Sequence, residues 1–491
     1  INHVGYFFSI DYLPSSIEVQ TTLGTIKGKL VEDNLTGARW YSFQGISYAE
    51  PPVGDLRYKP PVQRQPSPTI IDATKPGYVC PQPDEFHSRD EMNEDCLNLN
   101  IYTPANNSLT KNLPVIFNIH GGHFSYLSGN AEPKYLIISI SIYIKFSLGA
   151  LGFLSLCTEE ISGNAGLKDV LLALKIVHEN IGKFGGDSNK ITISGDGAGA
   201  VLAELLMLTK EATGLFQSVV LYSGSVLSPE FMQLNPMENA LLLGQELGLD
   251  LSNKEVTMDK LKHVDPFDII KAQEAIERRN PQRGFCIRGL FKPVVEIEST
   301  SAVLTRPPLE LLKEGAIYDV PMVIGFNNKE GVEMIPLLER EPELMDRFNK
   351  NSELLIPADI KYPIGSEACK NLGARIKDFY FDGGDINSTN MPQYLDLISD
   401  TKYTVSIDYL IQLFKEKKKS SVYYYVFAAD TELNWFKAMK NITYSGVSHL
   451  DKLGFYFFTS VTKSRYQHLK PDTLLVQTRF LQAIKNFMYY G

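Results

Sequence analysis

Compact apolar runs alternate with helical patterns along most of the chain. Short runs of four to six residues, rich in apolar and β-branched side chains and bounded by turn residues, predict buried strands. They occur at residues 115–119, 191–194, 218–222, 320–324 and 422–427. Apolar positions three and four residues apart predict a helix over 169–181, and residues 235–280 predict charged helices. Buried strands that alternate with helices indicate a mostly parallel central sheet covered on both faces. Residues 17–60 instead predict short antiparallel strands joined by turns.

Composition narrows the function classes. The 491 residues are 44% hydrophobic and 21% charged, which is typical of a globular protein with a sizeable core. The formal net charge of −9 argues against a nucleic-acid-binding protein, which usually presents a basic face. The apolar stretch 135–153 is interrupted by Lys145 and several serines, so we expect a buried strand and a glycine-rich turn there, and no membrane span.

Residues 193–200, with the sequence ISGDGAGA, have the form of a nucleophile elbow that carries glycine at its apex. An apolar strand precedes the turn and a helix start of small residues follows it. In a G-x-S-x-G elbow, serine occupies the position of Gly197. Glycine has no side chain, so it can neither attack a carbonyl nor carry an acyl group. The motif therefore predicts the framework of a serine hydrolase without its nucleophile.

Further segments, in the same order along the chain, resemble signatures of the type-B carboxylesterase and cholinesterase family. They are 43–54 (FQGISYAEPPVG), 94–102 (EDCLNLNIY), 120–124 (HGGHF), 148–154 (LGALGFL), 164–169 (NAGLKD), 291–296 (FKPVVE) and 325–331 (GFNNKEG). The resemblance implies an α/β-hydrolase fold: a large, mostly parallel central sheet flanked by helices, with a small antiparallel N-terminal sheet. It also implies one domain over 17–491, shortened at its C-terminus relative to the family, after an unassigned segment 1–16.

The resemblance assigns roles to individual residues. Glu330, in GFNNKEG, corresponds to the acid of the catalytic triad, and His449, in YSGVSHLDKL, corresponds to its base. The backbone N–H groups of Gly122, His123 and Ala198 would form the oxyanion hole. The family has no metal or organic cofactor, and we expect none here.

Several positions depart from the family pattern. Asp196 replaces a glutamate, His123 a small residue, Ile176 a tryptophan and Val170 a glutamine. An elbow nucleophile is held at positive φ, which costs roughly 1–3 kcal/mol for a non-glycine residue. Glycine adopts that conformation with little penalty. The spread of the departures favours natural drift over a single engineered change at position 197.

Cysteines and glycosylation motifs bear on location. In the family, cysteines at the positions of Cys80 and Cys96 form a disulfide; Cys157, Cys286 and Cys369 are expected to be buried thiols. Sequons occur at Asn34, Asn106, Asn387 and Asn441. Together with the disulfide they favour a secreted glycoprotein, with the cytoplasm or the lumen of the endoplasmic reticulum as alternatives.

Two functions follow from these residues. The first is a pseudoesterase without hydrolase activity, which binds a small lipophilic ester, another hydrophobic ligand or a protein partner. The second is an active carboxylic ester hydrolase with Glu330 as acid and His449 as base, if Gly197 is an engineered change or a sequence error. Ser194, Ser223 and Ser225 are the neighbouring hydroxyls, and we expect structural roles for them.

Overall fold

The structure, a computed structural model, describes residues 13–33, 37–105, 109, 112–130, 132–133, 139–249, 254–279 and 289–491. Residues 1–12, the sequon residues Asn34 and Asn106, and Cys286 lie outside the described residues.

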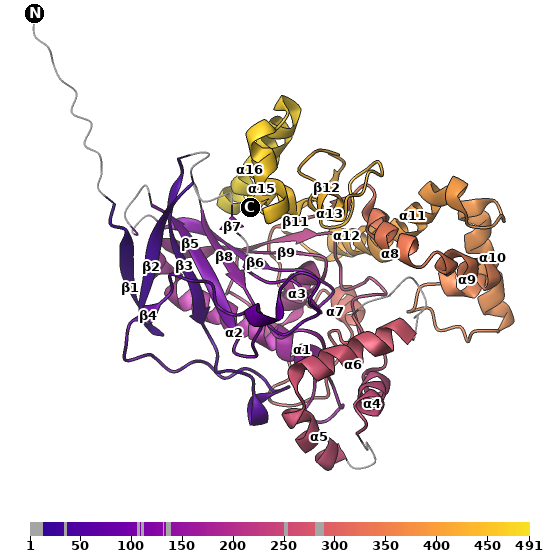
Figure 1. Ribbon diagram of the computed structural model, residues 1–491, viewed down its shortest axis with the longest axis horizontal. Helices are drawn as coiled ribbons and strands as arrows, with labels where there is room; N and C mark the ends of the chain where they lie inside the picture. Colours follow the sequence, from indigo (N-terminus) through magenta and orange to yellow (C-terminus); the bar gives the residue numbers. More distant parts are fainter. Residues whose placement is uncertain are drawn as a thin grey trace, which may run out of the picture.

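One large mixed sheet organises the chain (Figure 1). Its strands follow the spatial order β1-β2-β3-β5-β8-β6-β9-β10-β11-β12, and β4 pairs with β2. The bounds are β1 Ser16–Thr21, β2 Gly24–Glu32, β3 Arg39–Ser47, β4 Ile71–Asp72, β5 Asn98–Pro104, β6 Leu113–Ile119, β8 Ile140–Ile144, β9 Gly186–Asp196, β10 Ser218–Tyr222, β11 Met322–Asn327 and β12 Val422–Phe427. A separate short pair joins β7 (Glu132–Pro133) to β13 (Phe457–Phe458).

The sheet changes character along its width. From β1 to β8 through β3 and β5, neighbouring strands pair antiparallel; from β8 to β12 they pair parallel. The expected antiparallel N-terminal strands therefore continue the central sheet, because β3 pairs with β5. This arrangement, together with the helices on both faces, is the α/β-hydrolase architecture predicted from the sequence.

Helices cover both faces of the parallel half. The bounds are α1 Gly149–Phe153, α2 Ala165–Asn180, α3 Ala198–Leu208, α4 Pro236–Glu246, α5 Lys254–His263, α6 Pro266–Arg279, α7 Pro308–Glu314, α8 Ile335–Arg340, α9 Glu343–Lys350, α10 Glu367–Phe381, α11 Met391–Ser399, α12 Val405–Lys417, α13 Trp435–Lys440, α14 Leu453–Tyr456, α15 Ser460–Lys463 and α16 Pro471–Tyr490. Figure 1 shows α1 and α2 on one side of the sheet and α16 on the other. Helices α8 to α11 form an outer lobe around a small core of their own.

Strand β10 shows why a continuous apolar run suits a central strand. Val219 and Leu221 pack into the main core with α2 and α3, whereas Val220 and Tyr222 pack against α16 on the opposite face. Successive side chains of a strand point to opposite faces, so a strand covered on both sides is apolar at most positions.

Strand β12 corrects one expectation. Residues 422–427 form a strand as predicted, but the strand is not buried: Tyr423, Tyr424 and Val426 are 50%, 45% and 50% exposed. Among the described residues β12 pairs only with β11, so it is the edge of the sheet and its apolar side chains are covered incompletely.

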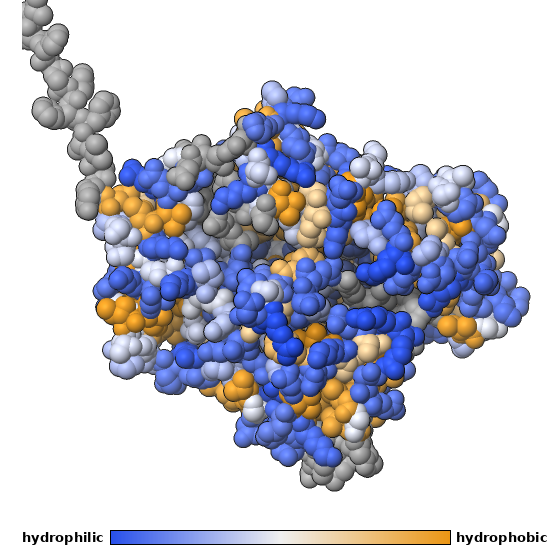
Figure 2. Space-filling model, in the orientation of Figure 1, coloured by the Kyte–Doolittle hydropathy of each residue, from blue (hydrophilic) through white to orange (hydrophobic). Residues whose placement is uncertain are grey.

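Hydrophilic residues cover most of the face of the molecule that Figure 2 draws, and hydrophobic residues are scattered among them. Within the described ranges, no helix combines the length and apolar character needed to cross a bilayer.

Cys369 is buried as expected, but the free thiol of Cys157 is exposed, which corrects the prediction of a buried side chain. Cys157 lies in the loop after α1 at positive φ, outside the core.

Candidate active site

Gly197 forms the sharp turn between β9 and α3. Its backbone has φ 54° and ψ −115°, and its N–H donates to the Tyr222 carbonyl of the neighbouring strand at 2.8 Å. The conformation is the strained one expected at an elbow apex, and glycine adopts it without a Cβ penalty. A Cβ built at this position would lie 2.9 Å from His449 Nε2. The apex therefore points at the imidazole.

Backbone packing holds the turn in place. A Cβ on Gly199 would overlap the Ile119 carbonyl oxygen, and one on Gly224 would overlap the Gly197 carbonyl oxygen. A Cβ on Gly121 would lie 2.5 Å from the Asp196 carbonyl oxygen. The elbow, the loop after β6 and the loop after β10 thus approach one another as closely as glycine allows.

His449 and Glu330 meet directly. His449 Nδ1 lies 2.9 Å from Glu330 Oε2, and the His449 N–H donates to the Glu330 carbonyl at 3.2 Å. Both side chains are buried, with 3% and 0% of each residue exposed. With Nδ1 donating to the carboxylate, Nε2 is directed at the apex, which is the tautomer a general base needs.

The carboxylate of Glu330 is held from its other side. Glu330 begins a 3₁₀ helix, Glu330–Met334, just after β11, and its Oε1 accepts from the backbone N–H of Asn327 at 2.5 Å. Asn327 Nδ2 in turn donates to the Ser448 carbonyl at 2.7 Å. The loop that carries Glu330 and the loop that carries His449 are therefore tied together beside the pair.

The surroundings of His449 favour its charged form. Burial alone lowers the pKa of His449, but the carboxylates of Glu333 and Glu330 outweigh burial and hold the pKa above its ordinary value. Tyr403 stacks on the imidazole with ring centroids 4.7 Å apart. Its hydroxyl donates to Glu333 Oε1 at 2.9 Å, so the stacked ring is itself fixed.

The predicted oxyanion donors lie at the rim of the turn. Gly122 and His123 follow β6, and Ala198 begins α3. Within the described part of the chain, none of their three N–H groups has a hydrogen-bond acceptor. Unengaged N–H groups beside the apex are what an oxyanion hole requires. His123 is at positive φ, 48°, which is unusual for a non-glycine residue.

The imidazole of His123 turns toward a buried charged cluster. His123 Nε2 lies 4.0 Å from Glu333 Oε2, and its ring centroid is 6.3 Å from that of His449. Burial, reinforced by the Lys402 ammonium, lowers the pKa of His123 to about 3, so the ring is neutral at physiological pH.

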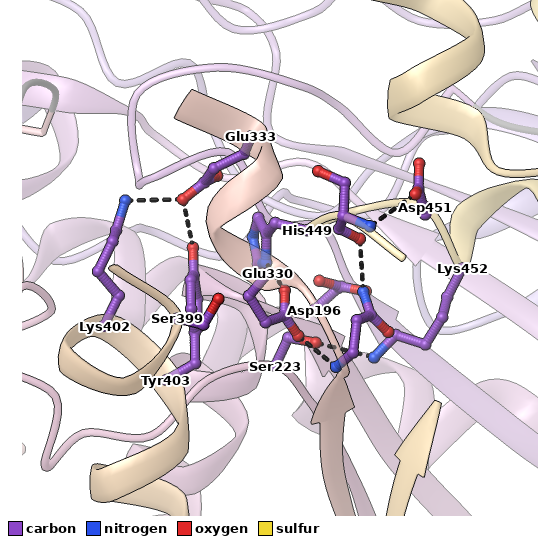
Figure 3. A network of polar contacts seen from close by, with 12 residues as sticks. Asp196, Ser223, Glu330, Glu333, Ser399, Lys402, Tyr403, His449, Asp451 and Lys452 are labelled. Atoms are coloured by element: carbon purple, nitrogen blue, oxygen red, sulfur yellow. Dashed lines mark hydrogen bonds and ion pairs between the residues drawn. The ribbon is translucent and has the colours of Figure 1, made fainter. Parts of the chain in front are cut away.

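Lys402 is the centre of that cluster, part of which is drawn in Figure 3. Its Nζ lies 2.7 Å from Glu333 Oε1 and 3.2 Å from Glu230 Oε2. Burial raises the pKa of Glu333, but Lys402 and, to a lesser extent, His449 outweigh burial and lower the pKa to about 2. A fixed negative charge therefore stands beside His449.

A second buried lysine, Lys452, reaches toward Ser223 (Figure 3). Lys452 Nζ donates to Ser223 Oγ at 2.9 Å and to the Tyr425 hydroxyl at 3.0 Å. Burial lowers the pKa of Lys452, and Asp196 opposes this. Asp196 Oδ2 accepts from the Tyr456 hydroxyl at 3.3 Å, whereas its Oδ1 has no partner among the described residues.

The hydroxyl groups of the neighbouring serines are engaged by other residues. Ser194 Oγ donates to Asn118 on the adjacent strand at 3.0 Å, and Ser223 Oγ is engaged by Lys452. Ser225 Oγ accepts from the Leu227 N–H at 3.2 Å. All three side chains are buried, and none stands at a strand-to-helix apex.

Two cavities open beside the turn. The larger, of about 330 Å³, has Gly121 and Asp196 in its wall; its aromatic and leucine residues are Phe86, Leu127, Tyr143, Trp435, Leu450, Leu453, Tyr456 and Phe457. The smaller, of about 120 Å³, has His123, Glu230, Glu333 and Lys402 in its wall. Phe86 and Leu450 belong to both. Neither cavity has Gly197 or His449 in its wall.

Sequence reasoning missed the charged surroundings of the histidine. Glu333 carried a usable signal, because it stands three residues after Glu330 and so shares a face of the short helix. Lys452 did as well, since it occupies an aspartate position of the family's H-x-D-D-L segment. Glu230 and Lys402 had no local signal, because they lie 172 positions apart along the chain.

The structure also places the secondary features. Cys80 and Cys96 form a disulfide, as the resemblance implied. The sequon residues Asn387 and Asn441 are exposed. Among the described residues, no group of three or more histidine, cysteine or acidic side chains is arranged to hold a metal ion.

Comparison with known proteins agrees with this architecture. The model of the carboxylesterase family matches residues 15–491. A juvenile hormone esterase of Tribolium castaneum is 31% identical over 507 aligned residues, covering 98% of this chain and 84% of that protein. Venom carboxylesterase-6 of Apis mellifera is 29% identical, covering 96% and 86%.

A solved structure is similar throughout. The crystal structure of the juvenile hormone esterase from Manduca sexta, with OTFP covalently attached, superposes with a TM-score of 0.85 at 27% identity, covering 97% of this chain and 90% of that one. The family match over nearly the whole chain, the insect relatives and this structural similarity lead to one conclusion: the chain belongs to the carboxylesterase family.

Proposed function

We propose that this carboxylesterase-family protein is a pseudoesterase, which lacks serine-hydrolase activity and acts by binding a ligand in the cavities beside its elbow. The observation that carries the proposal is Gly197 at the apex, at φ 54° and facing His449 Nε2. Without a hydroxyl at this position no acyl-enzyme can form. In serine hydrolases the loss of the nucleophile costs on the order of a million-fold in kcat.

The ligand we propose is a small lipophilic ester or another molecule with an apolar body. Relatives named juvenile hormone esterase support an ester-like ligand, and the aromatic wall of the larger cavity supports an apolar one. A protein partner remains the alternative ligand class. The Cys80–Cys96 disulfide supports an oxidising compartment, and with the exposed sequon residues it favours secretion.

A second candidate function is carboxylic ester hydrolysis. It is favoured by the intact contact of His449 with Glu330 and by the unengaged N–H groups at the oxyanion position. Hydrolysis through this site needs a nucleophile, and Gly197 has no side chain that could supply one.

Ester turnover separates the two functions. Hydrolysis of a p-nitrophenyl ester by the purified chain is compared with hydrolysis by a His449→Ala variant. The proposal expects equal rates, because without a nucleophile His449 has no proton to accept. A wild-type rate more than tenfold above the variant would establish the hydrolase instead.

A further inference from the structure

The smaller cavity contains a buried carboxylate oxygen that nothing in the described chain satisfies. Glu230 is 4% exposed and lies in the wall of this cavity. Its Oε2 contacts Lys402 at 3.2 Å, but its Oε1 has no hydrogen-bond partner among the described residues. A buried acceptor left unsatisfied destabilises the folded chain, and more so when it is charged. This oxygen therefore calls for a donor from outside the chain.

The charges around the cavity decide which kind of donor fits. The wall of the cavity contains three acidic and three basic residues: Glu85, Glu230, Glu333, Arg340, Lys402 and Lys440. Burial raises the pKa of Glu230, and the ammonium groups of Lys402 and Lys292 oppose this. His123, also in the wall, is neutral. The three negative and three positive groups of the wall balance. A charged ligand would lose its hydration without gaining a net opposite charge, whereas a neutral donor avoids that cost.

The space suits a head group. About 120 Å³ holds several water molecules or a few heavy atoms, and the larger cavity, which shares Phe86 and Leu450 with it, offers room for an apolar body. We infer that Glu230 binds the hydroxyl of a lipophilic alcohol, with the O–H donating to Oε1 and the hydrocarbon lying toward the aromatic cavity. The inference rests on the proposed binding function and names the chemistry of its ligand.

Binding of three probes of matched size tests the inference. The full chain is titrated at pH 8 by calorimetry with 1-hexanol, hexylamine and methyl pentyl ether. The ether has no donor and the amine is charged. We expect 1-hexanol to bind about tenfold or more tightly than either, since a hydrogen bond to a charged group is worth about 1.5–3 kcal/mol. Equal affinity for alcohol and ether, or tighter binding of the amine, would overturn the inference.

Two variants locate the effect. Glu230→Met removes the acceptor, so the alcohol should lose its preference over the ether. Glu204→Gln is the matched control, because Glu204 is also buried with a carboxylate oxygen that lacks a partner in the described chain, yet it lies in the wall of neither cavity. The Glu204→Gln variant should still bind the alcohol more tightly than the ether. If this variant lost that preference, the assignment to Glu230 would be contradicted. Thermal unfolding checks that both variants fold.

The probes contain no ester bond. The turnover assay can therefore contradict the pseudoesterase function while the preference for the alcohol is still observed. Conversely, the alcohol preference can be absent while the turnover assay supports the pseudoesterase.

Discussion

The acid–base side of the site and its apex are maintained by different contacts. On the acid–base side, hydrogen bonds of side chains fix the geometry. The Glu330 carboxylate contacts the His449 imidazole and accepts from the Asn327 N–H, and Tyr403 stacks on the imidazole. At the apex, close backbone approaches around Gly197 and Gly199 fix the turn. Neither set of contacts involves a nucleophile. The framework can therefore persist when the reacting atom is lost, and a well-formed histidine–glutamate pair does not by itself establish catalysis.

The largest expected effect comes from restoring the hydroxyl with Gly197→Ser. We expect p-nitrophenyl acetate hydrolysis to rise by roughly 10²-fold or more, because the new hydroxyl would stand beside His449, which Glu330 contacts. The gain should fall short of the million-fold that a native serine provides, since a Cβ at this position lies 2.9 Å from His449 Nε2 and the ring must shift. Steady-state kinetics measures it, with Gly197→Ala as control. Equal rates for the two variants would show that the acid–base side is not competent.

The next effect tests whether the acid acts only when a nucleophile is present. In the Gly197→Ser background, Glu330→Gln should reduce kcat by roughly 10²–10⁴-fold, because an amide no longer stabilises the imidazolium or enforces the tautomer. In the Gly197 chain the same substitution should leave the background rate unchanged. A large loss in the Gly197 chain would mean that His449 and Glu330 already perform catalysis without the serine.

Stability tests the backbone side of the comparison. Gly199→Ala should cost about 3 kcal/mol or more in the free energy of unfolding, because its Cβ would overlap the rigid Ile119 carbonyl oxygen. Gly197→Ala should cost only about 1–2 kcal/mol, since positive φ is its main penalty and the nearest atoms belong to a side chain. Urea unfolding curves measure both. Equal costs would remove the distinction between apex and flanking glycines.

A smaller, pH-dependent effect is expected at Asp169, on α2 beside the turn at Ser147. Burial raises the pKa of Asp169 to about 7, although the Ser147 N–H donates to its Oδ2 at 2.9 Å. The folded-state pKa of this carboxyl lies above its unfolded value of about 3.8. The free energy of unfolding of the chain therefore falls as the pH rises between the two values. Asp169→Asn should therefore stabilise the chain at pH 8 by about 2 kcal/mol more than at pH 5.5.

Thermal or urea unfolding at the two pH values measures this difference. Asp55→Asn is the control, because the Asp55 side chain is 92% exposed. A pH-independent effect of Asp169→Asn, or the same shift in the control, would contradict the account of Asp169.

The strands and the elbow could be predicted because their signals are local. A parallel strand covered on both faces is a continuous apolar run, as in β10, and an elbow needs glycines at fixed offsets. The exposure of β12 could not be predicted, because its run of tyrosine and valine resembles that of a buried strand and the pattern does not show what covers it. The charged cluster around Lys402 could not be predicted either, because its residues come together only in the tertiary fold.

Covalent labelling is the most direct test of the loss of the nucleophile. The full chain and its Gly197→Ser variant are incubated with a p-nitrophenyl alkylphosphonate, and their intact masses are measured. We expect the Gly197 chain to keep its mass, and the variant to gain one phosphonyl group on residue 197. An adduct on the Gly197 chain, mapped to another residue beside His449, would reveal a working nucleophile and contradict the pseudoesterase.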